Sequence, residues 1–201
     1  MNAVLYVHGK GGSADESSRY EPLFPARDVF GLDYKTFTPW ETGAEIRAAV
    51  KELKEKYENV ILIANSIGAF FSMNADVSAD VEKAYFISPI VDMERLIRDM
   101  MTWANVDENE LCRRGVIHTA FGEDLSWDYL CYVRKNPTRW NVKTHILYGE
   151  NDNLTSLETV HRFASEHGAT LTVMKGGEHW FHTDEQMKFL DQWIKHTEEK
   201  I

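Results

Sequence analysis

Three things are scarce in this 201-residue chain: cysteine, net positive charge and long apolar runs. Cys112 and Cys131 keep no metal-ligand spacing, so we expect two buried, reduced thiols, with a disulfide as the alternative. The formal net charge of -10 argues against binding to a nucleic-acid backbone. No apolar run approaches the length of a membrane span, and Met1–Val7 enters strand-like sequence with no basic leader. We therefore expect a cytoplasmic protein without membrane insertion.

Signatures of cofactors and metals are missing as well. Lys10 precedes a glycine pair, so the spacing of a phosphate loop is absent, and no dinucleotide fingerprint follows the first apolar stretch. His179 and His182 lie three residues apart, but no Cys, Asp or third His keeps ligand spacing with them. We therefore expect no cofactor and no metal. Without repeats, low-complexity tracts or linkers, and with 43% hydrophobic and 27% charged residues, the chain is expected to form one domain over 1–201.

One stretch, Val60–Phe71, combines an apolar run, an abrupt Asn-Ser turn and a second apolar run. This pattern predicts a buried strand that turns sharply into a buried helix, with Ser66 on the turn. Ala64 and Gly68 are small, as a turn that brings strand and helix backbones together requires. The pattern follows the G-x-S-x-G nucleophile elbow with Ala in place of the first Gly. Taken alone, it fits a helix N-cap equally well.

Short apolar stretches alternate with amphipathic stretches along the rest of the chain. Capping-box spacings predict helix starts at Thr42, Thr155 and Thr183. Together with the stretch before Ser66, the segments that predict strands are Ala3–Val7, Asp33–Thr38, Lys83–Ser88, Thr144–Tyr148 and Thr170–Met174. This alternation predicts an α/β fold with a mostly parallel sheet flanked by helices.

Residues 90–140 break the rhythm and are expected to form a cap or lid insertion. A hairpin fits Gly115–Leu125. The region carries Trp103, Trp127, Tyr129, Tyr132 and Trp140. These rings either cover an apolar pocket or form the insertion's own small core, and the sequence does not decide between the two.

Four of the predicted strands end in loops that carry reactive residue types. In chain order the loops begin at His8, Asn65, Gly149 and Gly176, and they supply glycines, Ser66, Asp152 and His179. Ligands of doubly wound sheets bind outside the carboxyl ends of the strands, where these loops would meet. Ser before Asp before His is the chain order of a nucleophilic triad on this type of fold.

The four motifs together resemble the α/β-hydrolase superfamily, over nearly the whole chain. The chain begins at what would be the superfamily's third strand, so it resembles a compact member that lacks the first two. The resemblance implies that Ser66 is the nucleophile, His179 the general base and Asp152 the residue that orients the imidazole. It also implies an oxyanion hole made by the backbone N–H groups of Lys10 and Ile67, while His8 stabilises the turn.

Several alternatives stay open at this point. His182 is a second candidate base, and Glu150 and Asp92 are candidate acids. The expected activity is hydrolysis of an ester, thioester or related acyl bond of a small-molecule substrate, through an acyl-enzyme. An amidase or peptidase on the same fold, or a non-catalytic binding protein on a hydrolase scaffold, is the alternative. The aromatic insertion favours an acyl or aryl group, and the sequence predicts no oligomeric state.

Overall fold

The computed structural model describes residues 2–199, which fall into two compact units. The first unit comprises the chain up to residue 91 and from residue 139 onward, and the second comprises residues 92–138. The insertion predicted at 90–140 overlaps the second unit. Its role as a cap or lid stays a prediction.

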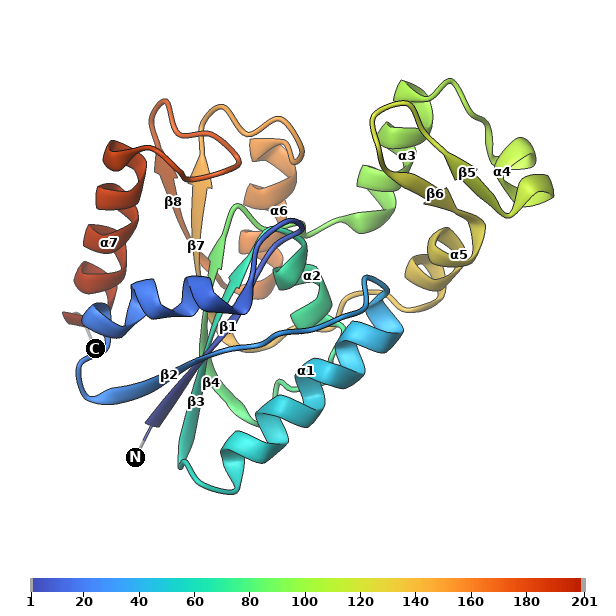
Figure 1. The fold of residues 1–201 in the computed structure, drawn as a ribbon. Coiled ribbons are helices and arrows are strands. Elements are labelled where there is room, and N and C mark those ends of the chain that lie inside the picture. The colour runs from blue at the N-terminus through green and yellow to red at the C-terminus, as the bar shows by residue number, and fades with distance from the viewer. Residues whose placement is uncertain (1, 200–201) are drawn as a thin grey trace. The chain divides into compact units, whose positions relative to one another are not determined.

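The first unit is built on a six-stranded sheet in the order β2-β1-β3-β4-β7-β8 (Figure 1). Every pairing in this sheet is parallel. Central strands read as continuous apolar runs because both of their faces are covered. The predicted α/β class with a mostly parallel sheet is therefore confirmed. The strands are β1 (Asn2–Val7), β2 (Arg27–Gly31), β3 (Asn59–Asn65), β4 (Val81–Ile87), β7 (Lys143–Gly149) and β8 (Thr170–Met174).

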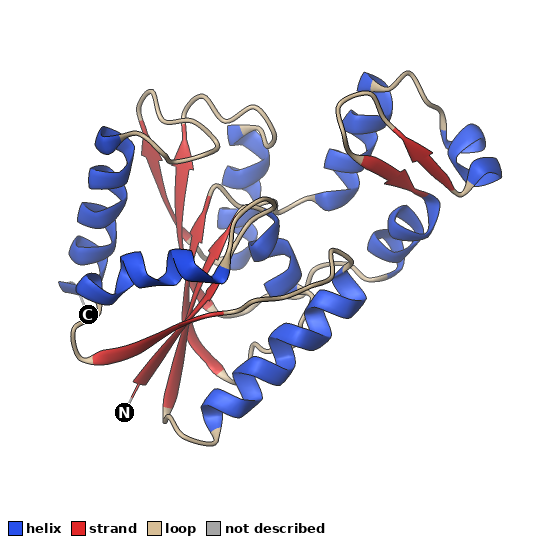
Figure 2. Cartoon of the chain, in the orientation of Figure 1, coloured by secondary structure: helices blue, strands red, loops and turns tan. Residues whose placement is uncertain are grey.

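Helices lie on both faces of the sheet (Figures 1 and 2). A 3₁₀ segment, η1 (Ala14–Leu23), and the last helix, α7 (Asp184–Glu199), cover one face. Alternate strand side chains such as Tyr6, Ile63 and Tyr85 pack in one core with residues of these two elements, because successive strand side chains point to opposite faces. On the opposite face lie α1 (Pro39–Lys54), α2 (Ile67–Met73) and α6 (Leu157–His167).

The structure corrects the prediction for the second strand. Residues 33–38, predicted as a strand, form a loop, and the strand is β2, which precedes them. As an edge strand, β2 pairs with one neighbour and is only half-buried, so its sequence lacks the apolar run of a central strand. The loop is fixed instead by the buried Tyr34, whose hydroxyl donates to the His8 carbonyl over 2.8 Å.

The predicted helix starts are correct in one case of three. α7 begins at Asp184, with Thr183 and Gln186 hydrogen-bonded as a capping box. α6 is capped by Ser156, one residue after the predicted Thr155. α1 begins at Pro39 with Thr38 as its N-cap, because proline is well suited to the first helical turn. The predicted cap, Thr42, uses its hydroxyl to hold the Thr36 carbonyl of the preceding loop over 2.7 Å.

The second unit contains three helices and a hairpin. These are α3 (Met93–Trp103), α4 (Glu108–Arg114), β5 (Val116–His118), β6 (Asp124–Ser126) and α5 (Trp127–Lys135). β5 and β6 pair antiparallel, as the hairpin prediction requires. Fully buried here are the aliphatic residues Leu111, Leu125 and Leu130, whereas Trp103 is 54% exposed. Trp140, predicted in the insertion, lies in the first unit, where its indole N–H donates to Thr144 Oγ1.

The cysteines differ from the prediction. Both are free thiols, but Cys112 is exposed and Cys131 is half-buried, so the expectation of buried thiols was wrong. Cys112 lies on the short helix α4, where only Leu111 is buried. Among residues 2–199, no helix is long and apolar enough to span a membrane.

Candidate active site

Ser66 lies on the turn between β3 and α2, in a backbone conformation that few residues adopt. Its φ of 52° and ψ of -119° fall in a region that is strained for a residue with a side chain. The surrounding backbone holds it there, since the Ser66 N–H donates to the Ile87 carbonyl and the Ser66 carbonyl accepts from Ile90. The strand-to-helix elbow predicted from the sequence is therefore present.

Gly68 explains why the elbow needs a small residue. A Cβ at this position would lie 2.6 Å from the carbonyl oxygens of both Val7 and His8, and neither backbone atom can move without disturbing β1. Ala64, on the other side of the turn, is completely buried. Small side chains thus allow α2 to pass directly over the end of β1.

Three side chains from three strand ends form one chain of hydrogen bonds. Ser66 Oγ lies 2.8 Å from His179 Nε2, and His179 Nδ1 lies 2.7 Å from Asp152 Oδ2. When Nδ1 carries the proton, it donates to the carboxylate and leaves Nε2 to accept from the serine hydroxyl. The Asp152 side chain is fully buried and that of His179 is 14% exposed. The structure therefore brings Ser66, His179 and Asp152 together in the order the sequence predicted.

The loop after β7 orients Asp152. Its second carboxylate oxygen, Oδ1, accepts from the backbone N–H groups of Leu154 at 2.8 Å and Thr155 at 3.0 Å. The nearby Tyr148 hydroxyl donates to the Thr155 carbonyl. Burial, followed by the negative charge of Asp152, raises the pKa of Tyr148 to about 12, so the hydroxyl stays neutral. Oδ2 is consequently left to face His179.

The Asp152 loop and the His179 loop are joined to each other. The Asn151 N–H donates to the Gly177 carbonyl over 2.7 Å. The Glu150 carboxylate accepts from the Gly176 N–H over 2.8 Å. These two contacts hold the acid and the imidazole at a constant separation. They also give Glu150, a candidate acid, a different set of partners from Asp152.

The glycine turn after β1 borders the elbow. Its backbone closes through a hydrogen bond from Gly12 N–H to the Gly9 carbonyl, and a Cβ on Gly9 would lie 3.1 Å from Ser66 Cβ. Lys10 is in this turn, and Ile67 is the first residue of α2. The two peptide groups predicted to bind an oxyanion therefore belong to segments that adjoin Ser66. Their role in binding an oxyanion stays a prediction.

Residues that the sequence analysis missed support this turn. The Tyr34 ring stacks on His8 at 4.1 Å, and the His8 Nδ1 lies 2.8 Å from the Gly9 carbonyl. Tyr6 donates its buried hydroxyl to the Glu16 carboxylate, whose other oxygen accepts from the Ser13 N–H. Burial raises the pKa of Tyr6 well above its usual range, so it acts as a neutral donor. The capping-box spacing of Ser13 and Glu16 is the signal that could have identified Glu16.

The remaining candidates lie elsewhere. The His182 ring stacks on Trp180 at 4.4 Å, and its Nδ1 lies 2.7 Å from the Trp180 carbonyl. Asp92 caps α3 by accepting from the Arg95 N–H. Within residues 2–199, no group of three or more His, Cys, Asp or Glu side chains could hold a metal ion.

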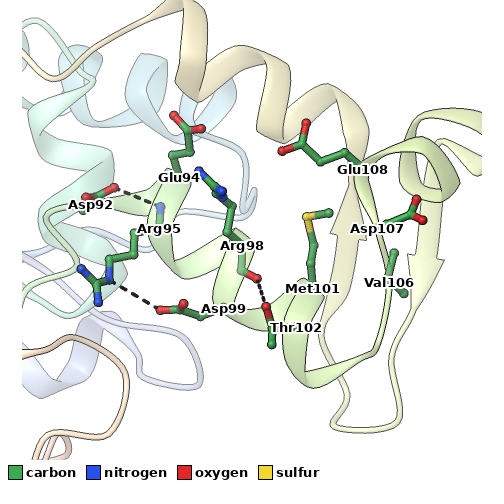
Figure 3. Close-up of a pocket in the computed structure, with 10 residues that line it drawn as sticks. All are labelled: Asp92, Glu94, Arg95, Arg98, Asp99, Met101, Thr102, Val106, Asp107 and Glu108. Carbon is green, nitrogen blue, oxygen red and sulfur yellow. Dashed lines mark hydrogen bonds and ion pairs between the residues drawn. The ribbon is translucent and has the colours of Figure 1, made fainter.

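The second unit contains a hollow of about 680 Å³ of its own (Figure 3). Charged side chains surround it, among them Glu94, Arg98 and Glu108 (Figure 3). Arg134 donates to both Glu94 and Glu108, which lowers the pKa of Glu108. This hollow is lined mostly by polar side chains and by no aromatic residue.

Comparison with solved structures supports the fold, whereas the sequence comparisons match little of the chain. No family profile matches the chain. A Mycoplasma genitalium protein named "Putative esterase/lipase 3" is 39% identical over 74 residues, which are 35% of this chain and 26% of that protein. Est1E from Butyrivibrio proteoclasticus superimposes with a TM-score of 0.79 at 15% identity, over 99% of this chain and 87% of that one. Mouse alpha/beta hydrolase domain-containing protein 10 gives 0.74 at 12% identity, over 98% and 90%.

Proposed function

We propose that this chain, which has the α/β-hydrolase fold of those structural neighbours, is a serine hydrolase that cleaves an ester, thioester or related acyl bond. The observation that carries the proposal is the hydrogen-bonded chain from Ser66 through His179 to Asp152. A serine held at a strained turn, with an oriented imidazole as its neighbour, has the arrangement of an activated nucleophile.

In the first half-reaction, Ser66 Oγ attacks the acyl carbon while His179 Nε2 takes the hydroxyl proton. The negative charge that develops on the carbonyl oxygen is stabilised by the backbone N–H groups of Lys10 and Ile67. The bond to the leaving group then breaks, and the imidazolium returns the proton to that group. The products are an alcohol or thiol and an acyl ester on Ser66.

In the second half-reaction, water takes the place of the serine hydroxyl. His179 removes a proton from water, the resulting hydroxide attacks the acyl ester, and the proton returns to Ser66 Oγ as the carboxylic acid leaves. Asp152 stays ionised throughout and stabilises the imidazolium through Nδ1–H. The two backbone N–H groups on its Oδ1 keep the carboxylate in this orientation.

Substitution of the nucleophile tests the proposal. Ser66→Ala is expected to reduce turnover of p-nitrophenyl esters by about 10⁵-fold or more, because the general base then has no hydroxyl to activate. It should also abolish labelling by a fluorophosphonate probe. Ser72→Ala is a matched control, since Ser72 Oγ donates to the Gly68 carbonyl within α2. Unchanged labelling of Ser66→Ala would rule out Ser66 as the nucleophile.

A substrate series separates this proposal from its alternatives. Esters, thioesters and amides with the same acyl group and increasing chain length should be hydrolysed at different rates, with the amides slowest. Preferential cleavage of the amides would assign an amidase instead. Wild-type protein that neither reacts with the probe nor hydrolyses any ester would indicate a binding protein on a hydrolase scaffold.

A further inference from the structure

The turn from Gly9 to Ser13 carries Lys10, one of the two proposed oxyanion donors, and it lies beyond the end of β1. Within the turn, the Gly12 N–H donates to the Gly9 carbonyl over 3.2 Å. A backbone N–H group stabilises an oxyanion only when it is held at hydrogen-bond distance from the place where the charged oxygen will lie. The contacts that hold this turn therefore bear on catalysis.

The Glu16 carboxylate lies against one end of the turn. Its Oε1 accepts from the Ser13 N–H over 3.2 Å, and its Oε2 accepts from the Tyr6 hydroxyl. A Cβ on Gly12 would lie 2.8 Å from Oε1 and 3.1 Å from Oε2. A side chain at that position would push the carboxylate away from both of its donors, so the glycine makes room for Glu16.

The Tyr6 hydroxyl connects this carboxylate to the elbow. Tyr6 is 1% exposed, and its ring packs on Tyr20 with the centroids 5.2 Å apart. Burial is the main reason that the pKa of Tyr6 is raised, and a hydrogen bond with the Asn65 side chain opposes the rise, as expected when the amide donates. Asn65 directly precedes Ser66. One hydroxyl therefore accepts from Asn65 and donates to Glu16.

The other end of the turn contacts the elbow directly. A Cβ on Gly9 would lie 3.1 Å from Ser66 Cβ and 3.3 Å from the Asn65 carbonyl oxygen. The turn is thus packed on the elbow at Gly9 and hydrogen-bonded through the carboxylate at Ser13, with Lys10 between the two contacts. A segment fixed at both ends keeps its N–H groups in place before a substrate binds.

We propose that Tyr6 and Glu16 are positioning residues that hold the Lys10 N–H at the correct distance from Ser66 for it to bind the oxyanion. This inference rests on the proposed hydrolase function. Neither side chain touches the substrate, and both act through the turn. Their contribution therefore belongs to the transition state, in which the carbonyl oxygen becomes charged, and not to binding of the neutral ester.

Glu16 has a second effect that opposes the first. A negative charge beside the turn disfavours an oxyanion, so removal of the charge alone would speed the reaction. Glu16 is exposed, and water and salt screen the charge of an exposed carboxylate. Loss of an oxyanion donor, in comparison, lowers kcat by about 10²- to 10³-fold. We therefore expect positioning to outweigh charge, which fixes the sign of the change that a charge-removing substitution should produce.

Tyr6→Phe tests the hydroxyl while keeping the buried ring. It should lower kcat/KM for p-nitrophenyl esters by about 10- to 100-fold, because the N–H is displaced and not removed. Affinity for a trifluoromethyl ketone should fall by the same factor, since its adduct with Ser66 carries the oxyanion. The corresponding methyl ketone, which stays neutral, should bind as it does to wild type. Tyr85→Phe is the matched control, because Tyr85 is also buried and donates to a carboxylate, that of Glu198.

Glu16→Gln tests the carboxylate at an exposed position, where a substitution is compatible with folding. Glutamine has one acceptor oxygen, so it cannot accept from both Tyr6 and the Ser13 N–H. Its kcat/KM should fall by about 10-fold or more. Combined with Tyr6→Phe, it should add little further loss, because both substitutions break the same chain of contacts. Asp15→Asn removes a neighbouring exposed charge and should leave kcat/KM unchanged.

Three results would overturn the inference: an increase in kcat/KM for Glu16→Gln, wild-type kcat/KM for Tyr6→Phe, or an equal loss of affinity for the methyl ketone and the trifluoromethyl ketone. Each can occur while wild type hydrolyses esters and Ser66→Ala does not, so each leaves the hydrolase proposal standing. Activity that survives in Ser66→Ala would instead contradict the hydrolase proposal itself.

Discussion

The two ends of the main sheet both hold buried hydrogen-bonded side chains, but their hydrogen-bond networks differ. At the amino end, Lys83 of β4 is 2% exposed and bonds to Glu198 of α7, which also accepts from Arg27 and Tyr85. Burial alone would raise the pKa of Glu198, but these three hydrogen bonds outweigh it and lower that pKa. Both cations of this cluster, Lys83 and Arg27, therefore share one carboxylate.

At the carboxyl end of the sheet, the chain of hydrogen bonds ends on a partly exposed hydroxyl. It runs from the buried Asp152 to the half-buried Ser66, whose hydroxyl has a proton to give and whose backbone is strained. The closed network stabilises helix and sheet, whereas the proposed function requires the open chain to let His179 take the Ser66 proton and give it to the leaving group. Burial of ionisable groups therefore does not identify a site on its own. A candidate site is identified by a partly exposed group that can transfer its proton.

We expect the largest loss of activity from a substitution in the hydrogen-bonded chain at the carboxyl end of the sheet. Asp152→Asn should lower kcat/KM for esters by about 10³- to 10⁴-fold, because an amide N–H facing Nδ1 forces the wrong imidazole tautomer. The asparagine oxygen can still accept from Leu154 and Thr155, so the loop and the melting temperature should change little.

Glu150→Gln is the matched control for Asp152→Asn. Glu150 binds the Gly176 N–H and not the imidazole, and a glutamine oxygen can keep that contact. Ester hydrolysis should stay within about threefold of wild type. A loss as large as that of Asp152→Asn would assign the acid role to Glu150 instead.

A change at the amino end should reduce stability and leave catalysis intact. Glu198→Ala leaves the Lys83 ammonium buried without its carboxylate, which should lower the free energy of unfolding by about 3 kcal/mol. For a chain of this length that corresponds to a fall of roughly 6–12 °C in Tm. Below the transition, kcat/KM should equal that of wild type.

Lys83→Met tests whether the buried ammonium without its carboxylate causes this loss of stability. Added to Glu198→Ala, it removes the more deeply buried of the two cations that lose their carboxylate, so the double variant should be more stable than Glu198→Ala alone. Glu52→Ala, which breaks an exposed pair with Lys56, should leave Tm unchanged and serves as the control. A double variant that loses more stability than Glu198→Ala would contradict the explanation.

The residues at the carboxyl end of the sheet could be predicted from the sequence, whereas those at the amino end could not. Ser66, Asp152 and His179 could be predicted because each follows an apolar strand whose end is marked by small or polar residues, and parallel strands bring their carboxyl ends together. The catalytic roles of these residues stay predictions. Gly68 could be recognised because the tightness of the turn is a local property.

What the sequence could not reveal depends on contacts between distant segments. A lysine within β4 looks unfavourable until α7, 115 residues further along the chain, supplies Glu198. Tyr34 was assigned to a strand, since nothing local shows that its ring stacks on His8. β2 was missed because an edge strand, bonded on one side only, needs no apolar run. In the second unit, the aromatic residues are prominent in the sequence, but leucines fill the core.

The smallest effect concerns pH and the amino end of the sheet. His145 stacks on Tyr85, and its Nδ1 lies 2.8 Å from Thr170 Oγ1. Burial, followed by the positive charges of Lys143 and Lys83, lowers the pKa of His145, although Glu198 opposes this. The folded protein therefore binds fewer protons here than the unfolded chain does. As pH falls below about 6.5, the unfolded chain gains a proton first, so the free energy of unfolding decreases.

His145→Gln should flatten this decline between pH 6.5 and 5.5, a range in which Glu198 stays ionised and adds no slope of its own. The effect is below about 1.4 kcal/mol per pH unit, the limit for a single proton. His118→Gln is the control, since that imidazole is exposed in the second unit beside Asp124. Chemical denaturation across the pH range measures both. An unchanged slope in His145→Gln would show that His145 does not cause the loss of stability at low pH, which would then come from other groups.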